Sequence, residues 1–392
     1  MNIEANQWLT LSRANLIHNL SSVRALVGNA RIPSNDPPTP AKYAGQVALG
    51  GGGRTVVAVV KANAYGAGAV GIARELSAHG VDAFAVATVS EGVELRAHGI
   101  RGVILCLTYF MPHEVAAIFA HDLTPTVFTT EAVRLLATEA HRQERLLDVW
   151  VKVDTGLSRL GVPHARAVEF IRQVSAEKWL NVAGVFSTVT ENPARDDAQV
   201  ERLRAVREQL ASRDVPFSIA SSHAILSSPH SYLDAVRPGI MLLGFEPSER
   251  ERMDMRLVRQ ADLQPIVTWQ TRVGYVKVVA AGEQVGYGVR STLTRDTPIA
   301  TLTIGWADGY PPRASESGHV LARGRCCPVL AVSANSTLVD VSDVPDVAIG
   351  EEVTLLGAQG NTTITPYELA QATGSVYRLL TGIPREMPRV WT

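Results

Sequence analysis

The sequence predicts an α/β protein in which a (β/α)8, TIM-like barrel is followed by a mostly antiparallel β-domain. Eight apolar, strand-like runs alternate with amphipathic segments between residues 55 and 242, and the pattern changes near residue 250. The length of 392 residues suits a barrel plus an added module. An open doubly wound sheet is the rival, but no GxGxxG follows the first strand, which disfavours its dinucleotide-binding version. We expect the barrel at 12–250 and the β-domain at 251–392 with 1–11.

The first segment, RANLIHNLSSVRALV at 13–27, has apolar residues at helical spacing. Residues 28–54 are rich in Pro, Gly, Asn and Asp, which predicts a surface loop. The predicted strands are 55–61, 83–89, 102–107, 124–128, 149–154, 182–187, 217–222 and 235–242. Predicted helices between them include 70–80, 90–99, 113–122, 130–143, 164–177 and 197–213. In such a barrel, functional groups lie where the strands end, at the carboxyl face.

Beyond residue 250 the sequence alternates between apolar and polar residues in short stretches such as TWQTRVGYVKVV and PVLAVSANSTLVDV. Gly, Pro and Asp turns separate these stretches, which is typical of antiparallel strands. One short helix is expected in ITPYELAQATG near the end.

The composition favours a small-molecule partner. A formal net charge of -1 with 19% charged residues gives no reason to expect binding to nucleic acid or to an acidic membrane. The three cysteines form no metal-ligand spacing, so no metal is expected, and a reducing cytoplasm fits them. The N-terminus lacks the basic and apolar regions of a signal peptide. We expect a cytoplasmic protein without membrane spans.

The stretch TVVAVVKANAYGAGA at 55–69 places Lys61 where a buried strand ends. A lysine amine in a partly desolvated pocket loses part of its preference for the charged state and can attack an aldehyde. Gly66 and Gly68 then interrupt the strand, so the backbone can approach a ligand closely. The alternative is a solvated lysine that closes an ordinary strand.

Two further stretches carry charged residues at strand ends. In VWVKVDTGLSRLGV, at 149–162, Lys152 and Asp154 lie on a strand and Arg159 follows a turn, where it can hold an anion by two hydrogen bonds. In AVRPGIMLLG, at 235–244, Arg237 precedes a proline. By themselves these patterns also fit a surface arginine and a turn arginine.

Together, VVKANAYGAG, KVDTGLSRLG and AVRPGIMLLG resemble the motifs of the alanine racemase family, pyridoxal 5′-phosphate (PLP) enzymes built on a barrel. The resemblance implies that Lys61 binds PLP, that Lys152 is a carbamylated lysine and that Arg159 contacts the substrate carboxylate and the cofactor phenolate. It also implies a set of groups that hold the cofactor phosphate, namely Tyr65, Ser222, Gly239, Ile240 and Tyr377.

The resemblance further implies that Arg237 faces the pyridine nitrogen of PLP. Because a guanidinium keeps its proton in a protein, the facing pyridine stays unprotonated. An unprotonated ring is a weaker electron sink, which favours return of the Cα proton, and hence racemisation, over transamination or elimination.

A fourth stretch, AGEQVGYGVRSTLTRD, places Tyr287 between two glycines in the β-domain. By itself, this pattern also fits a tyrosine that has only a structural role in a hairpin. The VGYG sequence resembles the family motif of the second catalytic base, which reaches the active site of a partner subunit. The resemblance therefore implies a homodimer with shared active sites, in which Lys61 and Tyr287 serve opposite faces of an amino-acid substrate with a primary amine.

Four positions depart from the family pattern. Ala67 replaces a histidine, Thr188 replaces a histidine that stacks on the cofactor ring, and Trp306 replaces the tyrosine of GYADGY. Ser333-Ala334-Asn335 replaces a segment that usually reads Ser/Cys-Met-Asp. The loss of a long side chain at Ala334, a substrate-contacting position, would admit amino-acid side chains larger than methyl.

Three functions remain open at this point. The first is an alanine racemase that makes D-alanine, and the second is a racemase with broader or shifted specificity, for instance for serine. The third is a barrel that binds PLP without turnover, which Tyr287 and the β-domain argue against. PLP-barrel decarboxylases use a cysteine motif that nothing in this chain matches.

Overall fold

The computed structural model describes residues 5–28, 54–210, 215–247, 253–287 and 291–392. Contacts between residues divide the chain into two compact units. The barrel unit comprises Leu16–Ala64 and Ala69–Gln264, and the C-terminal unit comprises Met1–Asn15, Tyr65–Gly68 and Pro265–Thr392. The division therefore falls at 264/265, whereas the sequence places it near 250. The loop predicted at 28–54 lies almost entirely outside the described residues.

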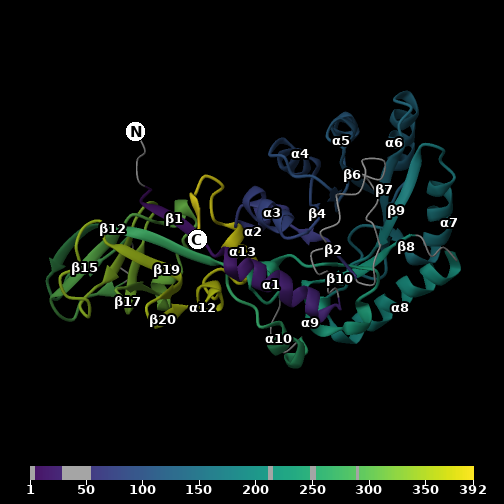
Figure 1. The fold of residues 1–392 in the computed structure, drawn as a ribbon. Helices are drawn as coiled ribbons and strands as arrows, with labels where there is room; N and C mark the ends of the chain where they lie inside the picture. The colour runs from purple at the N-terminus through teal and green to yellow at the C-terminus, as the bar shows by residue number, and fades with distance from the viewer. Residues whose placement is uncertain (1–4, 29–53, 211–214, 248–252, 288–290) are drawn as a thin grey trace. The chain divides into compact units, whose positions relative to one another are not determined.

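The barrel unit contains a parallel sheet in which the eight predicted strands are all present (Figure 1). Its order is β2-β11-β10-β9-β7-β6-β5-β4-β3. The strands are β2 (Thr55–Val56), β3 (Ala58–Val59), β4 (Ala83–Val86), β5 (Val103–Cys106), β6 (Thr124–Val127), β7 (Leu147–Asp154), β9 (Leu180–Phe186), β10 (Phe217–Ser221) and β11 (Ala235–Arg237), and the short β8 (Val162–Pro163) pairs with β7.

The two ends of this sheet are consecutive pieces of one segment, 55–60. The N–H of Val57 donates to the carbonyl of Val236, and the N–H of Val60 donates to the carbonyl of Ala85. One segment thus bonds to the last strand on one side and to the second strand on the other, which closes the barrel. The predicted fold class is confirmed.

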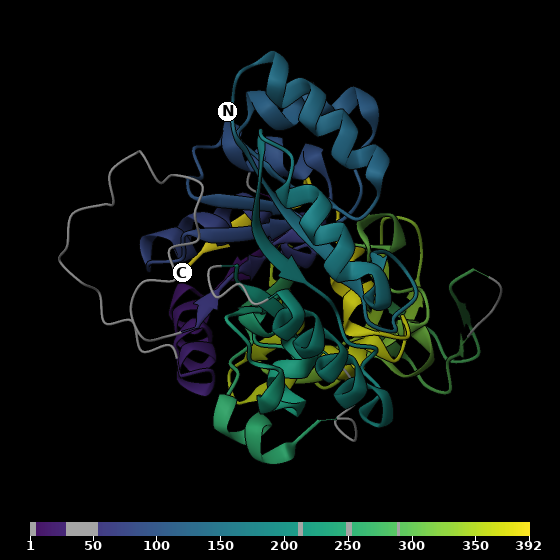
Figure 2. The same cartoon turned by 90° about the vertical axis from the view of Figure 1, so that its right-hand side faces the viewer.

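Helices lie outside the parallel strands, as Figures 1 and 2 show. In α6, Val133, Leu136 and Ala140 are buried at spacings of three and four residues, which is the apolar stripe that the sequence pattern predicts. The helices are α1 (Arg13–Leu26), α2 (Lys61–Tyr65), α3 (Ala69–Ala78), α4 (Val89–Ala97), η2 (Pro112–Glu114), α5 (Val115–Ala120), α6 (Thr130–Arg142), α7 (His164–Ser175), α8 (Pro193–Leu210), α9 (Ser222–Ser227), η3 (Pro229–Ser231), η4 (Ile240–Leu243) and α10 (Met255–Ala261).

The eighth predicted strand, 235–242, is shorter than expected. It ends at Arg237, because Pro238 has no N–H for the ladder, and the chain turns into the 3-10 helix η4.

Inside the barrel unit, Gly184 on β9 is paired in register with Trp150 on β7. A Cβ at Gly184 would lie 2.4 Å from the indole ring, so only glycine fits beside this buried tryptophan.

The C-terminal unit is built on a sheet of order β20-β19-β16-β17-β18-β15-β12-β1-β21, antiparallel except for the β1–β21 pair. Burial alternates along the first half of β12, as its sequence predicts. The strands are β1 (Gln7–Leu11), β12 (Val267–Val279), β15 (Thr297–Leu302), β16 (His319–Ala322), β17 (Arg325–Val332), β18 (Thr337–Asp340), β19 (Glu352–Gln359), β20 (Thr362–Ile364) and β21 (Arg389–Trp391), with a separate hairpin of β13 (Gln284–Val285) and β14 (Ser291–Thr292). The helices are η6 (Trp306–Asp308), α11 (Ala314–Ser317), α12 (Pro366–Ala370) and α13 (Val376–Thr381).

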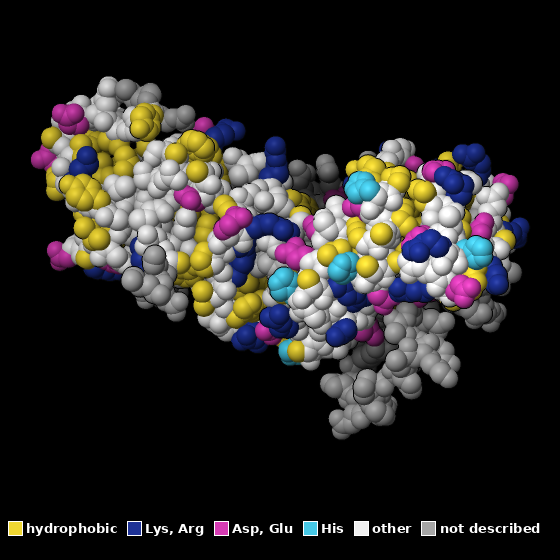
Figure 3. All heavy atoms as spheres, turned by 90° about the horizontal axis from the view of Figure 1, so that it is seen from above, with side chains coloured by type: hydrophobic (Ala, Val, Ile, Leu, Met, Phe, Trp, Pro, Cys, Tyr) yellow, Lys and Arg dark blue, Asp and Glu magenta, His cyan; other side chains and the backbone are white. Residues whose placement is uncertain are grey.

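On the face drawn in Figure 3, acidic and basic side chains are interspersed and do not gather by sign. This agrees with the net charge of -1. Among the described residues, no helix is both long and apolar enough to span a bilayer.

Candidate active site

Four cationic side chains of the barrel unit lie within electrostatic range of one another. Lys61 directly follows the first barrel segment, Lys152 lies on β7, Arg159 lies in the loop after β7, and Arg237 ends β11. Lys152 and Arg237 are each 4% exposed. The Lys152 ammonium lies 4.3 Å from the centroid of the Phe186 ring, and the Arg237 guanidinium lies 5.0 Å from the same centroid. The carboxyl ends of the strands therefore carry a cluster of positively charged side chains.

Burial and mutual repulsion lower the pKa of both lysines. Burial, followed by the charges of Arg237 and Arg159, lowers the pKa of Lys152 to about 7. Burial and then Arg159 lower the pKa of Lys61, although the carboxylates of Glu91 and Glu191 act in the opposite direction. Both amines are therefore closer to neutral than a solvated lysine, which is the condition for a nucleophile or a base.

Replacing Lys152 with methionine is expected to stabilise the cofactor-free protein at and below pH 7. The pKa of Lys152 is about 7 in the folded protein and 10.5 for a solvated lysine, so the native state binds fewer protons than the unfolded state between these values. The stability of the natural chain therefore rises with pH across that window, whereas the Lys152→Met variant lacks this contribution. The gap in free energy of unfolding should be largest below pH 7, with an upper limit of roughly 5 kcal/mol, and should close toward pH 10.

Denaturant unfolding of both chains at several pH values, in buffer depleted of carbon dioxide, measures this gap. Lys178→Met is the matched control, because Lys178 is exposed beside the Trp179 ring. A Lys152→Met gap that does not change with pH would contradict the lowered pKa.

Arg237 is held by neutral oxygens. Its Nη1 donates to the hydroxyl of Ser218 and its Nη2 donates to the carbonyl of Ser187, while the Thr188 hydroxyl lies 3.5 Å from Nη2. Burial lowers the pKa of Arg237 to about 9, so the group remains charged at neutral pH. Its charge is not compensated by these three partners and is available to a ligand.

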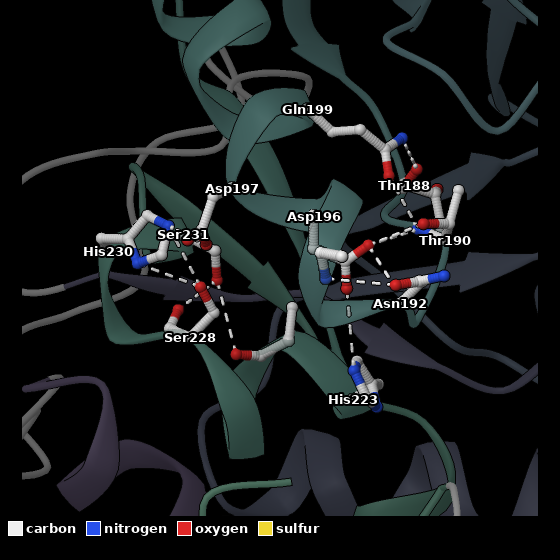
Figure 4. Close-up of polar contacts among 12 residues, drawn as sticks. Thr188, Thr190, Asn192, Asp196, Asp197, Gln199, His223, Ser228, His230 and Ser231 are labelled. Atoms are coloured by element: carbon white, nitrogen blue, oxygen red, sulfur yellow. Dashed lines mark hydrogen bonds and ion pairs between the residues drawn. The ribbon is translucent and has the colours of Figure 1, made fainter. Parts of the chain in front are cut away.

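The loop that carries Thr188 is fixed by residues at the start of α8 (Figure 4). The side-chain amide of Gln199 accepts from the N–H of Thr190 at 2.9 Å and donates to the carbonyl of Thr188 at 3.3 Å. The carboxylate of Asp196 accepts from the N–H and hydroxyl of Thr190, and it lies 3.7 Å from the buried ring of His223. Sequence reasoning missed this network, because Asp and Gln on a polar helix have no distinctive signal.

The backbone after Lys61 is strained. Ala62, Asn63 and Ala64 have φ values of 50 to 55°, and Tyr65 continues this left-handed turn with φ 52°. Each non-glycine residue in this region costs about 1–2 kcal/mol. The carboxylate of Glu91 accepts the N–H of Ala62 at 2.6 Å. Sequence reasoning also missed Glu91, although the capping-box pattern of Thr88-Val-Ser-Glu91 was visible.

Ser222 and Gly239, two of the predicted phosphate-binding residues, contact each other. The N–H of Gly239 donates to the Ser222 hydroxyl oxygen at 2.9 Å, which leaves the hydroxyl proton able to donate elsewhere. Ile240 is the first residue of η4, and the first N–H groups of a helix have no partner within it. These groups form a small donor cluster beside Arg237.

Tyr65 and Tyr377 also lie together, within the C-terminal unit. Their ring centroids are 5.7 Å apart at an angle of 53°. Gly66 follows with φ +88°, and a Cβ there would lie 2.0 Å from the carbonyl oxygen of Leu380. The glycine thus allows the Tyr65 turn to approach the helix of Tyr377.

The remaining predicted residues belong to the C-terminal unit. Tyr287 lies in the turn after β13 and is 87% exposed. Ala334 is partly buried, and its carbonyl accepts the N–H of Ala307 at 2.9 Å. The N–H of Trp306 donates to the carbonyl of Ser333, so two departures from the family pattern, at 306 and at 333–335, are neighbours.

The family model described as alanine racemase, N-terminal domain, matches residues 42–247, and the model of the C-terminal domain matches 266–391. An alanine racemase of Symbiobacterium thermophilum is 38% identical over 86% of this chain and 90% of its own, and one of Halothermothrix orenii is 36% identical over 85% and 89%. The solved alanine racemase of Clostridium difficile 630 superposes with a TM-score of 0.85 at 27% identity, over 100% of this chain and 97% of that one. The same enzyme has also been solved in complex with cycloserine (TM-score 0.82, 26% identity, 100% of this chain and 96% of that one).

Proposed function

The chain belongs to the alanine racemase family, and we propose that it is a PLP-dependent racemase that interconverts L- and D-alanine. The observation that carries the proposal is the gathering of the Lys61 amine with the Arg159 and Arg237 guanidinium groups, beside Lys152, at the carboxyl ends of the barrel strands. The two arginines suit a ligand with several negative charges, and the PLP phosphate and phenolate together with an amino-acid carboxylate supply them.

The phosphate of PLP would be held by the donor cluster at the end of β10 and β11. The Ser222 hydroxyl has a proton to donate, the N–H of Gly239 orients this hydroxyl, and the N–H of Ile240 follows at the start of η4. By the resemblance to the family, the phenols of Tyr65 and Tyr377, whose rings are paired within the C-terminal unit, are further candidates to contact a phosphate. Hydroxyl and amide donors of this kind fit a dianionic phosphate.

The two proton-transfer groups are Lys61 and Tyr287. Bound PLP withdraws electrons from the substrate and so makes the Cα proton removable. The lowered pKa of Lys61 supports its role as the base on one face. The exposed phenol of Tyr287 would serve the other face of a site in a second copy of the chain, so the active enzyme would be a homodimer with shared active sites.

The charges of the two arginines and of Lys152 suggest their roles. Arg237 would place a permanent cation against the pyridine nitrogen, which keeps that nitrogen unprotonated and favours racemisation over other outcomes. Arg159 would bind the substrate carboxylate. Lys152, with a pKa of about 7, has a large neutral fraction at physiological pH, which is the form that carbon dioxide carbamylates.

A racemase of broader specificity is the second candidate, and a specific observation favours it. Ala334 and Trp306 sit in two hydrogen-bonded segments at positions where the chain departs from the family pattern. A short side chain at Ala334 would leave space for substrates larger than alanine, for instance serine.

The free cysteines support a reducing compartment, and we propose the cytoplasm.

The test is exchange of the α-proton in deuterated water. The purified protein with PLP is expected to exchange the α-proton of L-alanine and to produce D-alanine, followed by NMR and by chiral chromatography. Serine and larger amino acids in the same assay rank the two racemase functions. A protein that binds PLP but exchanges no amino acid would contradict both and leave the barrel as a PLP carrier.

A further inference from the structure

Hydrogen bonds to neighbouring segments hold the left-handed turn after Lys61. The N–H of Ala64 donates to the carbonyl of Val60 at 2.8 Å, and the side chain of Asn63 accepts the N–H of Ala69 at 2.9 Å. The N–H of Ala62 donates to the carboxylate of Glu91. Residues in this backbone conformation stay there only where surrounding contacts fix them.

Glu91 links the ends of two neighbouring barrel strands. Its Oε1 accepts the N–H of Ala62, just after β3, at 2.6 Å. Its Oε2 accepts the N–H of Ala87, just after β4, at 2.7 Å, and the N–H of Thr88 at 3.4 Å. Since β3 and β4 are paired in parallel, one carboxylate fixes the position of the Lys61 segment relative to the next strand.

Helix capping alone does not account for this arrangement. Glu91 forms a capping box with Thr88 at the start of α4, and Glu368 forms the same box with Thr365 at the start of α12. The Glu368 carboxylate accepts from the N–H and the hydroxyl of Thr365, whereas Oε1 of Glu91 accepts from Ala62, which lies outside the helix cap. The bond to Ala62 is therefore additional to the cap.

We propose that Glu91 is a positioning residue for the racemase reaction, which sets the location of the Lys61 amine by fixing the turn that follows it. The proposal rests on the proposed function, because Lys61 is the proton-transfer group of that reaction. The carboxylate has a second effect at the same place. Glu91 raises the pKa of Lys61, as does Glu191, whereas burial, Arg159 and Arg237 lower it.

The variant Glu91→Gln separates these contributions from helix capping. Ala62 and Ala87 bond to different oxygens of Glu91, and glutamine has an acceptor oxygen at only one of these two places and carries no charge. Glu368→Gln is the matched control, because it alters the same capping box far along the chain from the lysine. The loss of stability from the weakened helix cap should be similar in the two variants.

Hydrogen exchange followed by mass spectrometry or NMR tests the positioning without use of activity. In the full-length PLP-loaded protein, the Ala62 amide is expected to exchange about tenfold faster or more in Glu91→Gln than in the natural chain. In Glu368→Gln the Thr365 amide should accelerate while Ala62 does not. Unchanged exchange at Ala62 in Glu91→Gln would overturn the proposal.

Kinetics supply the second readout. For Glu91→Gln we expect kcat for alanine to fall about tenfold or more with KM changed much less, because the base is misplaced and substrate binding is retained. The acidic limb of the rate profile should also move to lower pH, because loss of the negative charge lowers the pKa of Lys61. Normal kcat and an unmoved limb would overturn the proposal.

The variant Glu91→Asp covers the case in which Glu91→Gln does not fold. Aspartate keeps the charge but is one methylene too short to reach both strand ends, so fast exchange at Ala62 is expected with an acidic limb near its natural position. If Ala62 is protected in Glu91→Asp, the proposal fails. If the natural protein racemises no amino acid, the proposed function fails, and the exchange comparison still decides whether Glu91 fixes the turn.

Discussion

Replacement of Lys61 by alanine is expected to reduce racemisation of alanine by about 10³-fold or more. Lys61 follows the strand segment that closes the barrel, and burial and Arg159 lower its pKa. The variant loses the amine that is proposed both to bind the cofactor aldehyde and to act as the base on one face. The absorbance band of lysine-bound PLP should disappear, and α-proton exchange of L- and D-alanine should both be lost.

The control is Lys178→Ala, which removes an exposed lysine from the same barrel unit and should leave both readouts unchanged. Lys152→Met serves as a second comparison, because Lys152 belongs to the same cluster of charged side chains but is not proposed to bind the cofactor. If the absorbance band persists in Lys61→Ala and disappears in Lys152→Met, the assignment of the cofactor lysine is wrong.

The second large effect is expected from Tyr287→Phe. The phenol is 87% exposed, so its removal should leave the free energy of unfolding within about 0.5 kcal/mol of the natural value. Racemisation should nevertheless fall by about 10²–10⁴-fold, because one face of the substrate has lost its base. The loss should be asymmetric: the α-proton of one enantiomer should still exchange with solvent through Lys61, while that of the other should not.

Tyr275→Phe is the matched control, because Tyr275 is also an exposed tyrosine of the C-terminal unit. Proton NMR in deuterated water measures the rate of α-proton exchange for L-alanine and for D-alanine separately. The two rates show whether only one enantiomer has lost exchange. Equal loss of exchange from both enantiomers would show that Tyr287 acts in binding and not as the base of one face.

Sequence patterns predicted the strands of the barrel because they are largely apolar runs bounded by turns, which are continuous in 83–86 and 103–106. They also predicted the charged strand ends, since Lys61, Lys152 and Arg237 stand directly at or beside such runs. The roles of these residues came from resemblance to a family and stay predictions.

Contacts between distant residues were not predictable in the same way. The carboxylate of Glu91 reaches the turn after Lys61 only because β3 and β4 are adjacent, and Gln199 reaches Thr155 and Thr188 only because two loops meet beside α8. Pro238 indicates that the eighth strand ends at Arg237. The predicted strand extends to residue 242 because the residues after the proline are apolar.

Closure of the barrel by segment 55–60 has a consequence for how the protein is made. Thr55 pairs with Ala235, so the first strand waits for a partner that is synthesised 180 residues later. At ribosomal speeds of 5–20 residues per second, this delay is roughly 10 to 35 s. Until then the ring is open, and Lys61 lacks Arg237, one of the charges that lower its pKa. The reactive amine is therefore created late in biosynthesis, by topology, when the ends of the ring meet.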